Sequence, residues 1–228
     1  DTSYVAVIVT PQNDPPVVND TTVTIPEDST VTVCVDITDV DAGDSWTTSV
    51  CGSPANGTLT AGPAVIGSQV CLTYAPNGDW NGTDSICIIT CDAGGLCDTS
   101  IVEVIVTPVN DPPVVPDTTV TTPEDTPVSV CVDITDVDAG DNWTASVCGG
   151  PSNGTLTTGP NVVGTQVCLT YAPGAEWNGT DSICIITCDL GGLCDTSYVA
   201  VIVTPQNDPP VVPDTTVTIP EDSTITVC

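Results

Sequence analysis

The chain has 228 residues, of which 30 are Asp or Glu, and it contains no Lys, Arg or His. A formal net charge of −30 excludes internal salt bridges and repels nucleic acid and anionic membrane surfaces, so we expect neither as a partner. The missing His and Lys also remove the usual general bases and Schiff-base nucleophiles, and we therefore expect no enzyme.

Cysteine content and hydropathy predict a secreted protein. Thirteen cysteines in a chain of this size are typical of an oxidising compartment. A zinc-thiolate site is a poor alternative, because the sequence has no CxxC pair and no His. No apolar run reaches the roughly 18 residues needed to span a bilayer, so we expect no membrane insertion in this segment.

The chain repeats itself every 97 residues. The string Asn-Asp-Pro-Pro begins at Asn13, Asn110 and Asn207, two intervals of 97 residues each. Four parts follow from this period: the last strand of a preceding repeat plus linker (1–13), two complete repeats (14–110 and 111–207), and the first strands of a following repeat (208–228). We expect the polypeptide to continue in both directions, as part of a long filament.

Alternation of apolar and polar residues predicts strands throughout the first complete repeat. Taken in chain order, the alternating segments are 31–37, 46–51, 69–74, 86–91 and 97–106. Turn signals such as Asn56-Gly57, Asn77-Gly78 and Gly94-Gly95 separate them. About seven short strands per repeat, without a helical period, predict an all-β fold of tandem immunoglobulin/cadherin-like β-sandwich domains arranged end to end.

The same alternation places the cysteines on the outward faces of the strands, away from the core. Cysteines on one face of neighbouring strands are close enough to bridge. In this sandwich topology the predicted disulfides are Cys34–Cys71, Cys51–Cys87 and Cys91–Cys97 in the first repeat, and Cys131–Cys168, Cys148–Cys184 and Cys188–Cys194 in the second. The alternative is a set of free surface thiols.

Four strings at fixed spacing resemble a known family. They are Val-Asn-Asp-Pro-Pro-Val-Val (109–115), Asp-Val-Asp-Ala-Gly-Asp (39–44), Asn-Gly-Thr-Leu-Thr (56–60) and Trp-Asn-Gly-Thr-Asp-Ser (80–85). Together they are similar to the cadherin-like, or bacterial immunoglobulin-like, tandem repeats of bacterial surface proteins. The resemblance covers the whole chain and implies calcium at the junctions between repeats.

Oxygen-rich side chains at the poles of the sandwich support a hard-cation site, and Ca²⁺ tolerates irregular oxygen geometry well. Stacking repeats end to end predicts a calcium junction formed by Glu27, Asp79, Asp84, Asn110, Asp111, Asp136, Asp138 and Asp141. The equivalent junctions use Asn13, Asp14, Asp39, Asp41 and Asp44, then Glu124, Glu176, Asp181, Asn207 and Asp208. The alternative is that these are solvated loop acids that cap turns.

Glycan attachment is a further possibility that the sequence leaves open. Sequons occur at Asn19, Asn56, Asn81, Asn142, Asn153 and Asn178. Asn-Gly is also a favourable turn, which accounts for several of them without a glycan.

The linkers favour a structural role. Pro108 and the pair Pro112-Pro113 restrict the backbone between repeats, and identical domains joined in the same way generate a filament. The sequence thus predicts an extracellular filament or cell-surface stalk whose partners are neighbouring repeats of the same chain or filament. The alternative is an adhesin module that binds a carbohydrate or a protein through a sandwich face.

Overall fold

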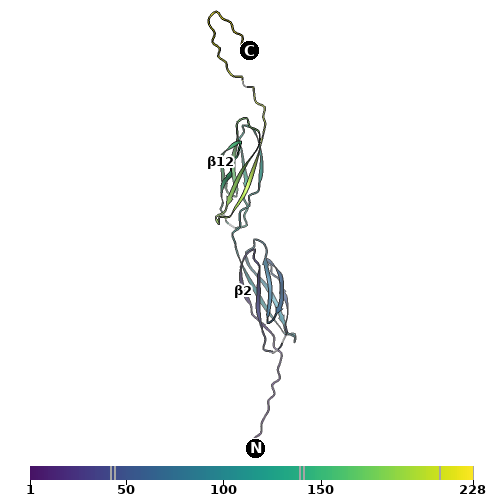
Figure 1. Ribbon diagram of the computed structural model, residues 1–228. Coiled ribbons are helices and arrows are strands. Elements are labelled where there is room, and N and C mark those ends of the chain that lie inside the picture. Colours follow the sequence, from purple (N-terminus) through teal and green to yellow (C-terminus); the bar gives the residue numbers. More distant parts are fainter. Residues whose placement is uncertain (42, 44, 139, 141, 211, 228) are drawn as a thin grey trace. The chain divides into compact units, whose positions relative to one another are not determined.

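The computed structural model describes residues 1–41, 43, 45–138, 140, 142–210 and 212–227. The chain divides into two compact units, Asp1–Asn110 and Asp111–Cys228 (Figure 1). All regular structure among the described residues is β-strand. The all-β prediction is therefore confirmed.

The first unit is a sandwich of two four-stranded sheets. One sheet has the order β1-β3-β6-β5 and the other the order β2-β8-β7-β4. The strands are β1 (Val17–Val18), β2 (Thr21–Pro26), β3 (Val31–Thr38), β4 (Thr47–Gly52), β5 (Gly57–Ile66), β6 (Gln69–Pro76), β7 (Gly82–Cys91) and β8 (Cys97–Thr107). Neighbouring strands are antiparallel except for β2, which pairs with β8 in parallel. The first two strands, β1 and β2, thus join different sheets of the sandwich.

The second unit repeats this architecture, with sheets of order β10-β13-β12 and β11-β14-β15-β9. Its strands are β9 (Thr118–Pro123), β10 (Val128–Asp133), β11 (Thr144–Gly149), β12 (Gly154–Val163), β13 (Gln166–Pro173), β14 (Gly179–Cys188) and β15 (Cys194–Thr204). The counterpart of β1 is reduced to a single bridge between Val114 and Thr135.

Alternating residues of the strands fill the core between the sheets. In the first unit Ile86 and Ile88 of β7 and Val104 of β8 are completely buried. Tyr74 of β6 has the largest of the completely buried side chains described in this unit. Each Val, Leu or Ile side chain removed from water contributes about 1.5–3 kcal/mol, so the alternation read from the sequence is the main force that holds the two sheets together.

Both terminal segments, which we expect to belong to neighbouring repeats, lie outside the strands of the two units. Residues 1–10 have the same sequence as residues 195–204, which form most of β15. In the second unit Val201 is completely buried, whereas Val7, its counterpart near the start of the chain, is 81% exposed and lies outside any strand. The described residues from 205 onward also form no strand. A strand needs partners to satisfy its backbone hydrogen bonds, and none of the described strands pairs with either segment.

Candidate functional site

Three disulfides brace the sheets of each unit. In the first unit Cys34–Cys71 joins β3 to β6, Cys51–Cys87 joins β4 to β7, and Cys91–Cys97 closes the β7–β8 hairpin. The second unit carries the bridges Cys131–Cys168, Cys148–Cys184 and Cys188–Cys194. Each bridge joins cysteines on adjacent strands, as the alternation in the sequence requires. The thirteenth cysteine, Cys228, lies outside the described residues.

One cysteine departs from the expected outward exposure. Cys71 is only 7% exposed. It lies on a central strand, flanked by Cys34 of β3 on one side and by Ala64 of β5 on the other. The two neighbouring strands and the disulfide together cover it.

A buried tyrosine and aspartate tie β6 to β7 in the first unit. Asp84, 5% exposed, accepts hydrogen bonds from the backbone of Ala55 (2.9 Å), Asn56 (2.8 Å) and Ser85 (2.9 Å). The hydroxyl of Tyr74 also donates to Asp84, at 3.1 Å. Burial raises the pKa of Asp84, but these four hydrogen bonds outweigh it and hold the pKa below its ordinary value.

The second unit repeats this network around Asp181. Its carboxylate accepts from the backbone of Ser152, Asn153 and Ser182 and from the hydroxyl of Tyr171. Burial first, and then the hydrogen bond to Asp181, raises the pKa of Tyr171 to about 12. Asp84 and Asp181 were expected to bind calcium. In the structure their carboxylates accept hydrogen bonds from turn amides of their own domains, which are partly buried groups that require an acceptor.

Two buried glutamates hold the outgoing ends of the units. Glu27, 4% exposed, accepts a hydrogen bond from the backbone nitrogen of Val109 and another from the side-chain nitrogen of Asn81, at 3.3 Å. In the second unit Glu124 accepts from the backbone nitrogen of Gln206. Both glutamates were expected as calcium ligands. In the structure they fix the backbone just after the last strand of their own unit.

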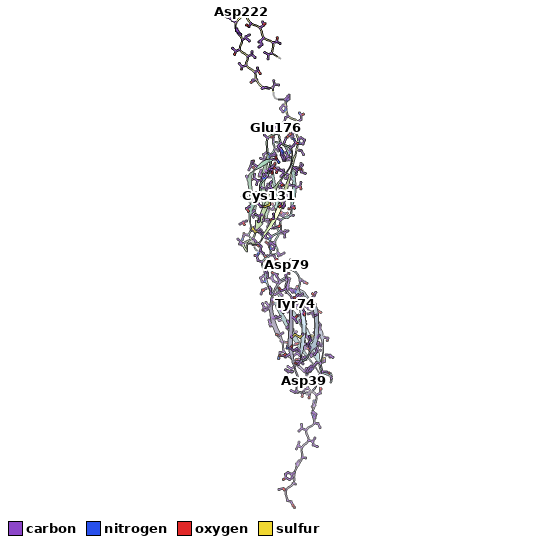
Figure 2. The ribbon with its side chains drawn as sticks, in the orientation of Figure 1. Asp39, Tyr74, Asp79, Cys131, Glu176 and Asp222 are labelled. Carbon is purple, nitrogen blue, oxygen red and sulfur yellow. A yellow bond between two sulfur atoms is a disulfide. The ribbon has the colours of Figure 1, made fainter. Side chains whose placement is uncertain are left out.

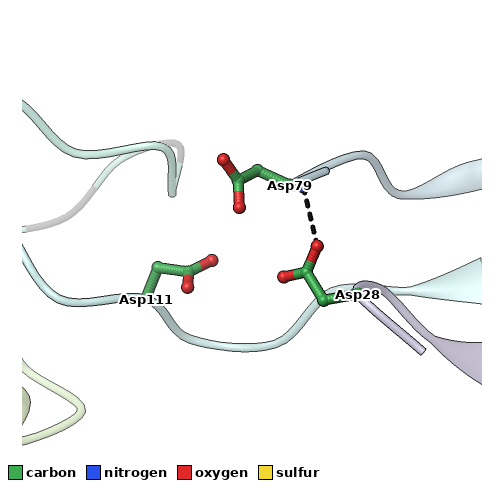
Figure 3. Close-up of side chains that lie close together, drawn as sticks. All are labelled: Asp28, Asp79 and Asp111. Atoms are coloured by element: carbon green, nitrogen blue, oxygen red, sulfur yellow. Dashed lines mark hydrogen bonds between the residues drawn. The ribbon is translucent and has the colours of Figure 1, made fainter. Parts of the chain in front are cut away.

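Beside these glutamates lies a cluster of carboxylates. In the first unit the backbone nitrogen of Asp79 donates to Asp28 at 3.1 Å, and the two side chains lie next to each other (Figure 3). In the second unit the counterparts Asp125 and Glu176 form a group with Asp208, in which one oxygen from each residue lies within 4.8 Å of the others. By the 97-residue period Asp111 is the counterpart of Asp208.

Asp28 and Asp125 are cluster members that the sequence reasoning missed. Each is the last residue of a Pro-Glu-Asp string, at 26–28 and 123–125, and the recurrence of this string was a signal present in the sequence. Asp28 and Asp79 also adopt left-handed backbone torsions, with φ of 57° and 54°. Aspartate tolerates this conformation better than most residues, so the turn itself favours an acid at both positions.

The carboxylates of this cluster repel one another. The charge of Asp208 first, then its hydrogen bond and the charge of Asp125, raise the pKa of Glu176 above its ordinary value. Three carboxylates without nitrogen or sulfur ligands form an oxygen-only donor set, which fits a hard divalent cation. The charged groups repel one another, and a bound cation would relieve that repulsion.

The opposite pole of the first unit carries the second set of predicted acids, and Figure 2 places Asp39 and Asp79 at opposite ends of this unit. The backbone nitrogen of Asp14 donates to Asp41 at 2.8 Å, and that of Asp41 donates to Asp39 at 3.0 Å. The indole of Trp46 also contacts Asp39, at 3.5 Å. These carboxylates therefore hold the incoming chain.

The second unit has the same arrangement at its incoming end. The backbone nitrogen of Asp111 donates to Asp138 at 2.7 Å, and that of Asp138 donates to Asp136 at 3.1 Å. Asp44 and Asp141, also predicted as ligands, lie outside the described residues.

The linker asparagines and the sequons have mixed environments. The side-chain nitrogen of Asn13 donates a hydrogen bond to Asp92 at 2.9 Å. Asn110 is the last residue of the first unit, and Asn207 is exposed. Of the predicted sequons, Asn56 is half-buried, and the exposed residues are Asn19, Asn81, Asn142, Asn153 and Asn178. The side-chain nitrogen of Asn81 is already engaged by Glu27, so this sequon has a structural role.

Comparison with known proteins identifies the repeat. The bacterial Ig domain family matches residues 13–105 and again residues 110–202. Comparison with curated protein sequences gives no significant match. Within the described residues, no helix has the length and apolar character needed to cross a bilayer.

A solved cadherin structure shares the fold, and weaker alignments include a second cadherin structure and a glycoside hydrolase. Extracellular cadherin domains 1–5 of protocadherin gamma B2 align with a TM-score of 0.50 and 18% identity, over 86% of this chain and 40% of that chain. Domains EC1-2 of the human mucin-like protocadherin align with a TM-score of 0.49 and 19% identity, over 84% and 98%. An endo-fucoidan hydrolase from glycoside hydrolase family 107 aligns with a TM-score of 0.37 and 17% identity, over 84% of this chain and 29% of the hydrolase.

Proposed function

Because the chain belongs to the bacterial Ig domain family, of which it carries two tandem copies, we propose that it is a structural segment of a secreted extracellular filament or cell-surface stalk. Its domains are stiffened by disulfides, and its junctions are stiffened by calcium. Neighbouring repeats of the same chain or filament are its main partners.

The observation that carries this proposal is the anchoring of the linker. The backbone of Val109 is hydrogen-bonded to Glu27 of the first unit. Only two residues later, the backbone of Asp111 is hydrogen-bonded to Asp138 of the second unit. Asn110 is the one residue between these anchors, and Pro108, Pro112 and Pro113 flank them. A linker held so closely at both ends has few free torsions, as a load-transmitting segment requires.

Calcium binding is supported by the group of Asp125, Glu176 and Asp208. The group offers three carboxylate oxygens within 4.8 Å of one another. The mutual repulsion of these carboxylates raises the pKa of Glu176, and a bound divalent cation would relieve that repulsion. The incoming-pole acids Asp136 and Asp138, and their counterparts Asp39 and Asp41, are the proposed second contribution to each junction.

Calcium titration and small-angle X-ray scattering test the proposal on the whole chain. We expect added Ca²⁺ to raise the melting temperature and to narrow the distribution of inter-unit distances, and EDTA to reverse both. The double variant Asp125→Asn/Glu176→Gln should lose part of the calcium response. Asp133→Asn is the matched control, because Asp133 is an exposed acid on β10 whose contact is the side chain of Gln166, at 2.7 Å.

Two outcomes would contradict the proposal separately. A melting temperature unaffected by millimolar Ca²⁺ would contradict calcium binding but not the structural role as a stalk. A broad, calcium-independent distribution of inter-unit distances, typical of freely jointed domains, would contradict the structural role as a stalk.

A second candidate, an adhesin module, is favoured by one feature of β15. Tyr198 is 50% exposed and Ile202 is 40% exposed on the outward face of this strand. Exposed aromatic side chains can stack on carbohydrate or anchor a protein partner. A glycan array probed with the whole chain is the test, and selective binding that Tyr198→Ala abolishes would favour the adhesin.

A further inference from the structure

The hairpin loop between β7 and β8 is unusually well fixed for an exposed turn. Its ends are joined by Cys91–Cys97. Inside it, Asp92 is only 6% exposed and accepts a hydrogen bond from the backbone of Leu96 at 2.9 Å. The backbone nitrogen of Asp92 donates in turn to the carbonyl of Leu96, also at 2.9 Å. The loop, residues 91–97, therefore presents one oxygen of Asp92 in a defined position.

That oxygen binds the linker. The side-chain nitrogen of Asn13 donates to Asp92 Oδ2 at 2.9 Å. The amide group of Asn13 also lies directly on Gly94, because a Cβ atom added to Gly94 would be 2.7 Å from Asn13 Nδ2. Gly94 does not have a left-handed torsion, unlike Gly95 with φ of 86°. Close approach of Asn13 is thus the reason for a glycine at position 94.

The carboxylate of Asp92 is kept in its charged, accepting form. Burial raises its pKa, but hydrogen bonds from Asn13 and from the backbone of Leu96, Gly95 and Gly94 lower the pKa overall. Next to Asn13, the backbone of Asp14 is held by Asp41 at 2.8 Å. Loop 91–97 therefore binds the side chain of Asn13, and the loop that carries Asp41 binds the backbone of the next residue, Asp14.

We propose that loop 91–97 is a preformed receptor for the asparagine of the incoming linker, and that the Cys91–Cys97 disulfide serves to keep this receptor formed. A bridge that closes so short a loop gains less from chain entropy than the two bridges that close loops of more than thirty-five residues. A positioning role explains its presence better than global stability does. By the 97-residue period, Asn110, Asp189 and the Cys188–Cys194 bridge are the residues equivalent to Asn13, Asp92 and Cys91–Cys97.

This inference concerns the same linker as the proposed function, and Asn13 and Asp41 are also predicted calcium-junction residues. The Asn13–Asp92 hydrogen bond itself needs neither calcium nor an extracellular partner. The test is hydrogen exchange of the Asn13 side-chain amide, measured by NMR on the whole chain labelled with ¹⁵N-asparagine in calcium-free buffer. Asn207 is an internal reference, because residues 204–212 repeat the sequence of residues 10–18. Among the described residues, Asn207 has no side-chain hydrogen bond comparable to that of Asn13.

We expect the Asn13 amide to exchange at least several-fold more slowly than that of Asn207. The double variant Cys91→Ser/Cys97→Ser should abolish this difference at a temperature where circular dichroism shows a folded chain. Cys51→Ser/Cys87→Ser is the matched control, since it removes another disulfide of the same unit and should preserve the protection. Gly94→Ala, which leaves every disulfide intact, should also abolish it.

Two results would overturn the inference. One is equal exchange of Asn13 and Asn207 in the unmodified chain. The other is protection of Asn13 that survives removal of Cys91–Cys97. Neither result depends on the calcium titration or on the scattering measurement, so this inference and the proposed function fail independently.

Discussion

Replacing Tyr74 by Phe removes the buried hydroxyl that ties β6 to β7 and that also lies 3.4 Å from the carbonyl oxygen of Asn56. Tyr74 is completely buried, and its hydroxyl donates to the carboxylate of Asp84 at 3.1 Å. Phe keeps the ring and its packing, so the variant removes the hydroxyl without opening a large cavity. Asp84 retains its three backbone donors and so stays partly satisfied.

The expected loss follows from the kind of bond removed. A hydrogen bond to a charged group contributes about 1.5–3 kcal/mol, and no water can replace the hydroxyl at a fully buried site. We therefore expect Tyr74→Phe to lower the free energy of unfolding of the first unit by about 2 kcal/mol. For a domain of this size such a loss lowers the melting temperature by about 8–16 °C.

Differential scanning calorimetry of the whole chain measures this effect. Because Tyr171 and the second unit are unchanged, the thermogram should separate into two transitions, and the double variant Tyr74→Phe/Tyr171→Phe should bring them together again at the lower temperature. Tyr198→Phe is the control, since Tyr198 is 50% exposed and should lose less than about 0.5 kcal/mol. A loss for Tyr74→Phe no larger than that of the control would refute the reasoning.

Three further predictions concern packing, pH and covalent bracing. Gly57→Ala should cost about 1–3 kcal/mol of stability in chemical denaturation, because the added Cβ would lie 2.4 Å from the Tyr74 ring, whereas Gly78→Ala, with its nearest such atom at 3.9 Å, should be nearly neutral. The pKa of Asp84 and that of Asp181 are lowered in the fold, so their contribution is complete above the ordinary value of 3.8 and is lost as the pH falls through the lower folded pKa. Urea midpoints measured from pH 5 to pH 2 should therefore fall less steeply in Asp84→Asn/Asp181→Asn than in the unmodified chain. Removing Cys51–Cys87 should cost about 3.8 kcal/mol and removing Cys91–Cys97 only about 2.2 kcal/mol, from sequence separations of 36 and 6, and equal losses in guanidinium unfolding would contradict this ordering.

Several features of the protein could be predicted from the sequence because they depend on local periodicity. The 97-residue period separates the two units, and the alternation of apolar residues identifies strands and core. The same alternation places Cys34 and Cys71 on corresponding faces of neighbouring strands, and the register of β3 with β6 then sets them opposite each other. These results need only the two-residue period of a strand and a standard order of strands.

The roles of individual acids could not be predicted in this way. Glu27, Asp28 and Asp84 look equivalent in the sequence as acids near a turn. In the structure Glu27 binds a linker amide, Asp28 lies beside Asp79, and Asp84 is buried under Tyr74. Which carboxylate meets a backbone amide and which meets another carboxylate depends on loops that are brought together from distant parts of the chain.

Residues 1–10 and 195–204 show most directly what only the tertiary structure decided. Their sequences are the same, so their propensities, hydropathy and alternation are identical. One copy is the buried strand β15, paired with β14 and β9, and the other forms no strand. The sequence determined that this segment can be a strand with one apolar face. Whether it becomes one depends on a neighbouring strand to accept its hydrogen bonds and on a facing sheet to cover its valines, and both are properties of the folded domain.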